Sequence, residues 1–378
     1  MSVALGTYSR GLERQGITEL RESAEFRLAA ECCRANFAGA LPILVARPTP
    51  RFNWPLFLDV ARYHRIEGLV WNALSQADFA FPNDIHDDLS KAASAIAARN
   101  VTAMAECVEL RDAFARANVP LLFLKGIPLG AIAYVNPALK ASVDIDLLIA
   151  PADLLLATKV LRDLKYQVSI PSSDSVLARW HRRSKESVWV KDQGRIQIDL
   201  HTRAADNPSL IPWVGVHSPT HLVRVAPGLT LPTLDTAEQF AYLAVHGGTS
   251  TWFRLKWISD FAGFLSSKSP EEIGRLYRRS QELGAGRAAD QGLLLADRLF
   301  GTLNGNGSLR DELLQDRLSR YLMTTSLALL WRTPSEPTER FLGTLPLHLN
   351  TFLLKPGLRY KLTELAGQGG RLLNRFAR

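Results

Sequence analysis

The stretch Val143-Asp-Ile-Asp-Leu-Leu-Ile149 decides the fold. Successive side chains of a strand point to opposite faces, so Asp144 and Asp146 project on one side while the isoleucines and Leu147 form a buried face. Two carboxylates on one face repel each other, and each resists the loss of water. A cation between them relieves both costs, and such oxygen ligands suit Mg²⁺ or Mn²⁺. The stretch therefore predicts a strand with a metal site, although a lone Asp-x-Asp pair is common on solvated strands.

A third acid lies on a later stretch with the same alternation, Arg195-Ile-Gln-Ile-Asp-Leu-His201. Its apolar residues face inward, while Gln197, Asp199 and His201 face the other way. If this strand lies beside the strand of Asp144, Asp199 completes a cluster of three carboxylates. Such a cluster can hold two metal ions, one at an acceptor hydroxyl and one at a triphosphate. In a second interpretation Asp199 acts as the base toward the acceptor.

The surrounding sequence alternates between strands and helices. Glycine and proline mark the turns, and the hairpin signal Asp192-Gln-Gly194 joins the last two strands. The order β-α-β-α-β-β-β predicts a small mixed sheet within residues 119–232. The expected strands are 120–126, 142–150, 166–170, 186–191 and 195–201, and the expected helices are 128–134 and 151–164.

Lys125 and Gly126 stand where the first strand meets the following helix. A glycine at this point lets the backbone approach a phosphate closely, and a helix N-terminus favours negative charge. Lys125 would pair with the phosphate as a point charge. Because any strand-to-helix turn favours glycine, the pair indicates a phosphate site only together with the acids.

Helical periodicity dominates both sides of the sheet. Residues 1–118 are predicted as an N-terminal helical subdomain beginning its first helix near Thr18, and residues 233–378 as a C-terminal one. The predicted fold class is therefore α+β, a small mixed sheet flanked by helical subdomains. His246 is interpreted as ending a helix at Gly247-Gly248. The expected helices include 57–73, 84–117, 236–246, 251–266, 270–283, 287–300 and 308–331.

Charge and cysteine content bound the partners and the compartment. The chain has 378 residues, 45 Lys and Arg against 37 Asp and Glu, a net charge of +8 and a pI near 9.5. This balance suits a polyanion such as a nucleotide or nucleic acid, or serves solubility alone. Cys32, Cys33 and Cys107 are too few for a disulfide framework, so reduced thiols and a cytoplasmic location are expected. No signal peptide and no apolar run of ~20 residues is recognised, so no membrane span is expected.

Two basic segments stand out from the rest of the chain. Arg179-Trp-His-Arg-Arg-Ser-Lys185 is the densest basic run and contains an aromatic residue, as nucleic-acid contacts do. A solvated loop or a charged strand edge is the favoured interpretation. Residues 355–378 hold six basic residues and one acid, a net charge of +5. This tail is interpreted as a frayed end, with a basic amphipathic helix as the alternative.

Taken together, these motifs resemble a known family. Leu124-Lys-Gly126, Asp144-Ile-Asp146 and Ile198-Asp-Leu-His201 are similar to the core of the nucleotidyltransferase superfamily, which has the DNA polymerase β-like fold. More narrowly, a Lys-Gly pair in place of the usual Gly-Ser resembles the uncharacterised bacterial nucleotidyltransferase family. His246-Gly247 and Trp252-Phe-Arg-Leu-Lys-Trp-Ile-Ser-Asp260 resemble the helical part of the same family.

The resemblance implies the residues of an active site. Asp144, Asp146 and Asp199 would be catalytic and would bind Mg²⁺ or Mn²⁺. The residues expected to bind the nucleoside triphosphate are Lys125, Gly126, Lys140, Arg254 and Lys256. Lys140 stands where this family is expected to carry arginine, and no serine follows the glycine, so the grip on the triphosphate departs from the superfamily pattern. The tryptophans of the helical part are interpreted as core residues.

The leading hypothesis is an enzyme that moves a nucleoside monophosphate from an NTP to an unidentified acceptor and releases pyrophosphate. The acceptor would be a small molecule, sugar, peptide or protein, and the resemblance favours a biosynthetic role. The alternatives are a non-catalytic nucleotide- or protein-binding module on the same fold, and a toxin-like transferase acting on tRNA or protein. Exchanging Asp144 or Asp146 for asparagine is expected to abolish transfer and keep the fold, because it relieves like-charge repulsion.

Overall fold

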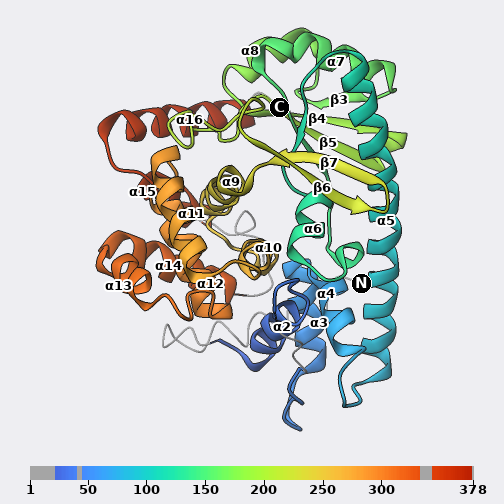
Figure 1. Cartoon of the computed structure of the whole chain (residues 1–378), viewed down its shortest axis with the longest axis vertical. Coiled ribbons are helices and arrows are strands. Elements are labelled where there is room, and N and C mark those ends of the chain that lie inside the picture. Colours follow the sequence, from blue (N-terminus) through green and yellow to red (C-terminus); the bar gives the residue numbers. More distant parts are fainter. Residues whose placement is uncertain (1–21, 41–44, 333–342, 377–378) are drawn as a thin grey trace.

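Five strands form one mixed sheet in the middle of the chain (Figure 1). The computed structural model describes residues 22–40, 45–332 and 343–376. The strands are β1 (Leu122–Phe123), β2 (Ile145–Leu148), β3 (Gln167–Ile170), β4 (Glu186–Lys191) and β5 (Ile196–His201), in the spatial order β1-β2-β5-β4-β3. The predicted sheet is therefore confirmed. Strand β1 is shorter than predicted because the chain leaves the sheet to enter a helix at Gly126, whose φ is +64°.

The topology brings β2 and β5 together as parallel neighbours, while the other neighbouring pairs are antiparallel. Their register places Asp146 opposite Asp199. The β4–β5 hairpin turns through Gln193 and Gly194, whose φ values of 57° and 87° lie in the left-handed region. Glycine enters that region without a steric cost, which is why this turn could be predicted.

Helices precede, interrupt and follow the sheet, so the α+β class is confirmed. Before the sheet lie α2 (Ala24–Arg34), α3 (Trp54–His64), α4 (Glu67–Leu74) and α5 (Asn83–Arg116). Between its strands lie α6 (Ile127–Ala133), α7 (Leu154–Asp163) and α8 (Leu177–His181). After it come α9 (Thr236–Thr249), α10 (Leu255–Leu265), α11 (Pro270–Leu283), α12 (Arg287–Phe300), α13 (Gly307–Gln315), α14 (Arg317–Leu330), α15 (Leu345–Leu353) and α16 (Leu358–Phe376).

Two hydrophobic clusters hold these layers together. In one, the second half of α5 packs Leu110 and Phe114 with sheet residues such as Leu147. The other joins helices from the two ends of the chain, and Phe37 after α2 meets Phe300 of α12 with ring centroids 5.2 Å apart. The long helix α5 runs beside the sheet at one end and beside α3 and α4 at the other (Figure 1). The boundaries expected at residues 118 and 232 stay predictions.

Several expected helices differ from the structure for local reasons. The helix expected over 57–73 is broken at Arg65, which adopts a left-handed φ of 57° and ends α3. The helix expected over 308–331 is broken at Asp316, whose carboxylate caps α14 by accepting from the Leu318 amide at 2.8 Å. The tail expected to be frayed instead forms α16. The helix start expected at Thr18 lies outside the described residues.

A two-stranded sheet of β6 (Thr220–Ala226) and β7 (Leu229–Leu234) was not predicted from the sequence. Gly228, with a φ of 71°, lies in the turn between them. The Thr233 hydroxyl donates to the Phe123 carbonyl at 2.6 Å, which ties β7 to β1. The alternating residues 229–234 after a turn glycine were the available signal for this hairpin.

Helix α9 continues through Gly247-Gly248 to Thr249, so the predicted helix stop after His246 is wrong. A Cβ on Gly247 would lie 2.3 Å from the indole of Trp252. That indole is 1% exposed, which confirms its place in the core. Trp257 is partly buried and packs against the same core. The absence of a side chain at Gly247 therefore makes room for an aromatic ring inside a continuous helix.

Replacing Gly247 by alanine is expected to lower the free energy of unfolding by about 1–3 kcal/mol, because the added methyl would overlap the Trp252 ring. Gly307, in the first turn of α13, has no heavy atom within 4 Å of an added Cβ and provides the matched control. Gly307→Ala should leave stability unchanged or slightly raised. Urea unfolding of both variants measures the difference. Equal losses in the two variants would contradict the packing explanation.

Within the described residues, no helix combines the length and the apolar character needed to cross a bilayer. Cys32, Cys33 and Cys107 are buried free thiols. Burial raises the pKa of the Cys33 thiol to about 12, so that thiol is protonated at neutral pH.

Candidate metal and nucleotide site

Asp146 and Asp199 meet in the middle of the sheet. They are register partners on β2 and β5, which confirms the predicted adjacency of the two strands. One carboxylate oxygen each from Asp146 and Asp199 and one ring nitrogen of His201 all lie within 4.8 Å of one another. Asp144, which directly precedes Ile145 at the start of β2, is not in this group. Its charge still acts on both Asp199 and Lys125.

Asp146 is 3% exposed, and one of its carboxylate oxygens contacts both a lysine and a histidine. The Lys125 Nζ lies 2.9 Å from Asp146 Oδ1, and the His201 Nε2 lies 3.1 Å from the same atom. Burial alone would raise the pKa of this carboxyl, but the Lys125 charge and the His201 contact hold the pKa well below its usual range. The second oxygen, Oδ2, is buried and has no hydrogen-bond partner among the residues that the structure describes. Asp146 is therefore an anion with one acceptor oxygen still free.

His201 connects Asp146 to a second ion pair. Its Nδ1 lies 3.3 Å from Glu186 Oε2, close enough for charge interaction but without the alignment of a hydrogen bond. Glu186 in turn pairs with the Lys185 Nζ at 2.9 Å. His201, Glu186 and Lys185 were not among the predicted site residues. Strand alternation places His201 on the same face as Asp199, but Glu186 becomes its partner only through the β4–β5 register.

Asp199 has fewer compensating partners than Asp146. The Gln197 amide donates to its Oδ1 at 3.1 Å. Burial, followed by the charges of Asp146 and Asp144, raises the pKa of Asp199 to about 7. The carboxyl group can therefore gain or lose a proton near neutral pH, and a cation beside it would favour the ionised form.

The donor set fits a divalent cation held by oxygen. Asp146 offers the unpartnered Oδ2, and Asp199 stands beside like charges that a cation would offset. Carboxylate oxygens suit Mg²⁺ and Mn²⁺, whereas imidazole ligands are typical of zinc, copper and iron. The His201 Nε2 already contacts Asp146, which suits a role in orienting that carboxylate.

Lysines gather around the carboxylates. Besides Lys125 and Lys185, Lys140 is buried and lies 3.3 Å from Asp260 Oδ2. Lys256 makes no hydrogen bond or ion pair with the residues that the structure describes. Burial and the nearby Lys140 charge lower the pKa of Lys256 to about 8, against the opposing effect of Asp260. A free, desolvated ammonium at this place favours the binding of an anion.

Two other predicted nucleotide contacts have different surroundings. Gly126 adopts a φ of +64° at the start of α6, a conformation that favours glycine and sets Lys125 beside Asp146. Arg254 is buried at the start of α10, donates to the carbonyl of Tyr63 in α3 and lies 5.0 Å from that ring's centroid. This placement gives no support to a triphosphate contact at Arg254. The sequence could not reveal it, because Tyr63 is far away in the chain.

Helix α9 covers the site with Tyr242 and His246, four residues apart on one helix face. The Tyr242 hydroxyl and the His246 Nε2 are buried, and neither has a hydrogen-bond partner within the described part of the chain. Burial, with the charges of Lys125 and Lys185, holds the pKa of His246 well below its usual range. His246 is therefore a neutral side chain next to the lysines, within the continuous helix α9.

The basic run at residues 179–185 is partly turned inward. His181 is buried and contacts Thr202 and Ser187, with ring nitrogens 3.0 and 2.9 Å from their hydroxyls. The Trp180 indole donates to the Glu186 carbonyl at 2.7 Å, and Lys185 pairs with Glu186. These contacts brace β4 beside the site, while Arg179, Arg182 and Arg183 of the same run are exposed.

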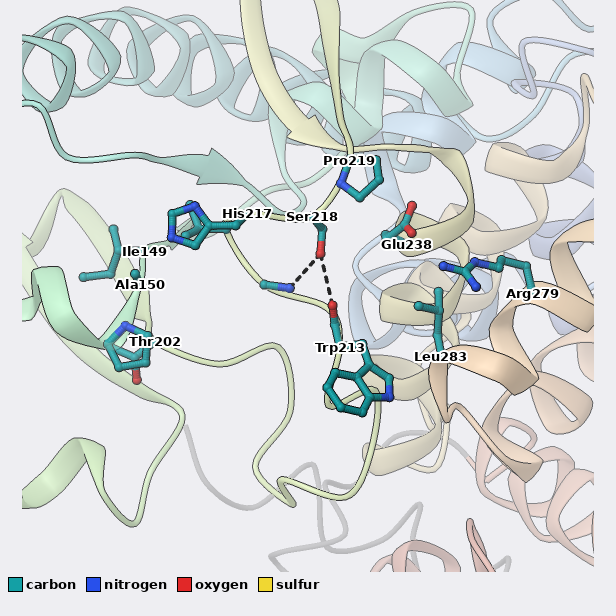
Figure 2. Close-up of a pocket in the computed structure, with 13 residues that line it drawn as sticks. Ile149, Ala150, Thr202, Trp213, His217, Ser218, Pro219, Glu238, Arg279 and Leu283 are labelled. Atoms are coloured by element: carbon teal, nitrogen blue, oxygen red, sulfur yellow. Dashed lines mark hydrogen bonds between the residues drawn. The ribbon is translucent and has the colours of Figure 1, made fainter.

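A cavity of about 380 Å³ opens beyond the carboxyl ends of β2 and β5 (Figure 2). Ile149 and Thr202, which directly follow β2 and β5, line it together with Glu238 from the first turn of α9. Its lining does not include Asp146 or Asp199. The cavity therefore lies beside the cluster of Asp146, Asp199 and His201 and does not include it.

A mixed sheet with paired acids on parallel central strands and lysines around them has the arrangement expected of a nucleotidyltransferase. The family described as uncharacterised nucleotidyltransferase matches residues 50–301, which is more than half of the chain. The chain belongs to this family. No curated protein matches it. The matched range contains the sheet, the carboxylates, the lysines and α9 through α12.

Proposed function

We propose that this chain is a metal-dependent nucleotidyltransferase that moves a nucleoside monophosphate from an NTP to an acceptor and releases pyrophosphate. The observation that carries the proposal is the pairing of Asp146 with Asp199 across parallel strands, with a buried Asp146 oxygen left unpartnered. Membership of the nucleotidyltransferase family supports the reaction class.

Asp146 and Asp199, joined by Asp144 just ahead of β2, would hold Mg²⁺ or Mn²⁺. Such an ion polarises phosphoryl oxygens and offsets the charge that develops on them. His201 and Lys125 fix the orientation of Asp146 through its other oxygen. This leaves the buried Oδ2 of Asp146, which has no partner among the described residues, as the oxygen that would bind the ion.

The lysines would hold the triphosphate. Lys256 has a free ammonium, and Lys125 is only partly committed to Asp146, so both can meet phosphate oxygens as point charges. Lys140, which is paired with Asp260, adds to the positive charge around the site. The backbone at Gly126 gives Lys125 its position. Arg254 is omitted from the proposed set because of its contact with Tyr63.

In the proposed reaction, the acceptor oxygen or nitrogen attacks the α-phosphorus, and the bond to the β-phosphate bridging oxygen breaks. Asp199 would either bind the cation together with Asp146 or, in the second interpretation, act as the base that takes the acceptor proton. The leaving pyrophosphate keeps the electron pair of the broken bond, and the lysines stabilise its charge.

Pyrophosphate release from each of the four NTPs, with and without Mg²⁺, tests the proposal. A thermal-shift screen identifies the preferred base first, because a bound ligand raises apparent stability. The proposal expects Mg²⁺-dependent release that increases when the acceptor is supplied. A nucleotide that binds without any release would favour a non-catalytic binding module.

Transfer of radiolabelled nucleotide to separated tRNA, protein and metabolite fractions identifies the acceptor class. Label in the metabolite or peptide fraction would support the hypothesis of a biosynthetic role. Label in tRNA or in a specific protein would favour the toxin-like alternative. His181 and Lys185 are engaged inside the protein, so a contact of this run with tRNA would depend on the exposed Arg179, Arg182 and Arg183.

A further inference from the structure

The cavity beside the carboxylates contains an acid that lacks a partner. Glu238 is only 4% exposed, yet it makes no hydrogen bond or ion pair with any residue in the described ranges. It lines the cavity on the side of Arg279 (Figure 2). Its carboxylate oxygens are not fully buried and open onto the cavity, where an entering hydrogen-bond donor or cation can pair with them.

The arginine that lines the same cavity is already engaged elsewhere. Arg279 lines the same side of the cavity, but its Nη1 donates to Glu282 Oε2 at 2.8 Å. The Glu238 charge acts on Arg279 only at longer range. The carboxylate of Glu238 therefore remains available to a hydrogen-bond donor or cation that enters the cavity.

An open aromatic ring stands on the rim of this cavity. Trp213 is 76% exposed, whereas large aromatic residues such as Trp189 and Trp252 are buried in the core. Its loop is braced, because the Ser218 hydroxyl donates to the Trp213 carbonyl at 3.3 Å and accepts from the Gly215 amide at 3.0 Å (Figure 2). An exposed indole face near an unpaired carboxylate is the combination that attracts an organic ammonium group.

The same helix links this cavity to the proposed reaction centre. Glu238, Tyr242 and His246 follow one another at four-residue intervals on one face of α9. Each interval advances by about 6 Å along a helix axis. Burial and then the charge of Asp146 raise the pKa of Tyr242, which places that residue beside the carboxylates. A ligand held at Glu238 would thus lie about one helical turn from groups that face Asp146.

We propose that this cavity is an acceptor subsite that recognises an organic ammonium group. The amine of the acceptor would pair with Glu238 and lie against the indole of Trp213, so that a neighbouring nucleophile extends toward Asp199. This inference rests on the proposed nucleotidyl transfer for its purpose, but the binding itself needs neither nucleotide nor metal. An amino sugar and an aliphatic polyamine are the two sources of such an ammonium group.

Calorimetric titration of the full chain, without metal or nucleotide, tests the subsite directly. The probes are glucosamine, spermidine and N-acetylglucosamine, the last being the uncharged counterpart of the first. We expect one of the amines to bind at least about tenfold more tightly than N-acetylglucosamine, which corresponds to about 1.4 kcal/mol. Binding of glucosamine alone would indicate an amino sugar, and binding of spermidine alone an aliphatic amine.

Glu238→Gln should weaken amine binding at least about tenfold, and Trp213→Ala should weaken it as well. Glu312→Gln, an equal charge change at an exposed position on α13, should have no effect. Thermal unfolding of each variant confirms that it is folded. Equal binding of glucosamine and N-acetylglucosamine, no binding of either amine, or unchanged affinity in folded Glu238→Gln would overturn the proposal.

The two proposals fail in different ways. Pyrophosphate release without amine binding would leave the nucleotidyl transfer standing and remove only the ammonium subsite. Amine binding that depends on Glu238, in a protein that releases no pyrophosphate, would keep the subsite and reject the transferase reaction.

Discussion

Asp199→Asn is expected to lower nucleotidyl transfer at least about 10²–10³-fold while the protein stays folded. Asparagine removes a negative ligand and the proposed base in one step. The fold should tolerate it, because burial and the charges of Asp146 and Asp144 already raise the pKa of Asp199 to about 7. A neutral amide relieves that repulsion and can still accept the hydrogen bond from Gln197.

Pyrophosphate release and thermal unfolding, measured side by side, check this expectation. Asp163→Asn, at an exposed position at the end of α7, makes the same chemical change away from the sheet and serves as control. The control should retain full turnover. An Asp199→Asn variant with turnover within a few fold of the native protein would remove this residue from the reaction.

Asp146 calls for a different variant than the sequence alone suggested. The sequence expectation was that Asp146→Asn keeps the fold because it relieves repulsion. The structure corrects this, since Asp146 is the direct partner of Lys125 at 2.9 Å and of His201 at 3.1 Å. Removing one member of a buried ion pair costs about 3–5 kcal/mol. Lost activity in Asp146→Asn would therefore mix chemistry with instability, whereas Asp199→Asn separates them.

The sequence predicted the parts of the site that depend on strand alternation. Asp146 and Asp199 each interrupt an apolar strand, and two such strands in one small sheet have few ways to avoid becoming neighbours. Contacts across the fold were beyond this reasoning. The pairing of Glu186 with His201 depends on the β4–β5 register, and the contact of Arg254 with Tyr63 depends on how α10 packs against α3.

Helix ends show the same division. The bounds of α11 and α12 could be predicted, because Pro270 and the glycines after each helix mark them locally. The stop expected at Gly247 was wrong, because the reason for that glycine is the Trp252 ring and not the helix end. A glycine signals that a side chain is excluded, but only the fold shows whether the cause is backbone conformation or a neighbour.

Lys125→Gln is expected to tighten the binding of Mn²⁺ alone by at least about tenfold and to weaken the binding of an NTP. The Lys125 ammonium lies 2.9 Å from Asp146 Oδ1, so it is the counter-ion of the carboxylate that would receive the metal. A divalent cation arriving there meets a like charge. Without the lysine that repulsion disappears, while the triphosphate loses a point charge that stabilises it.

This prediction rests on the proposed function and separates two roles for one lysine. If Lys125 binds phosphate only, its loss should weaken NTP binding and leave the Mn²⁺ affinity unchanged. Paramagnetic resonance of free Mn²⁺ measures metal binding without any reaction, and Lys159→Gln, exposed on α7, controls for the lost charge. Weaker Mn²⁺ binding in folded Lys125→Gln would show that the ammonium supports the metal ligands instead of competing with the metal. The opposed changes in the two affinities would identify Lys125 as a counter-ion that passes from carboxylate to phosphate when the site fills.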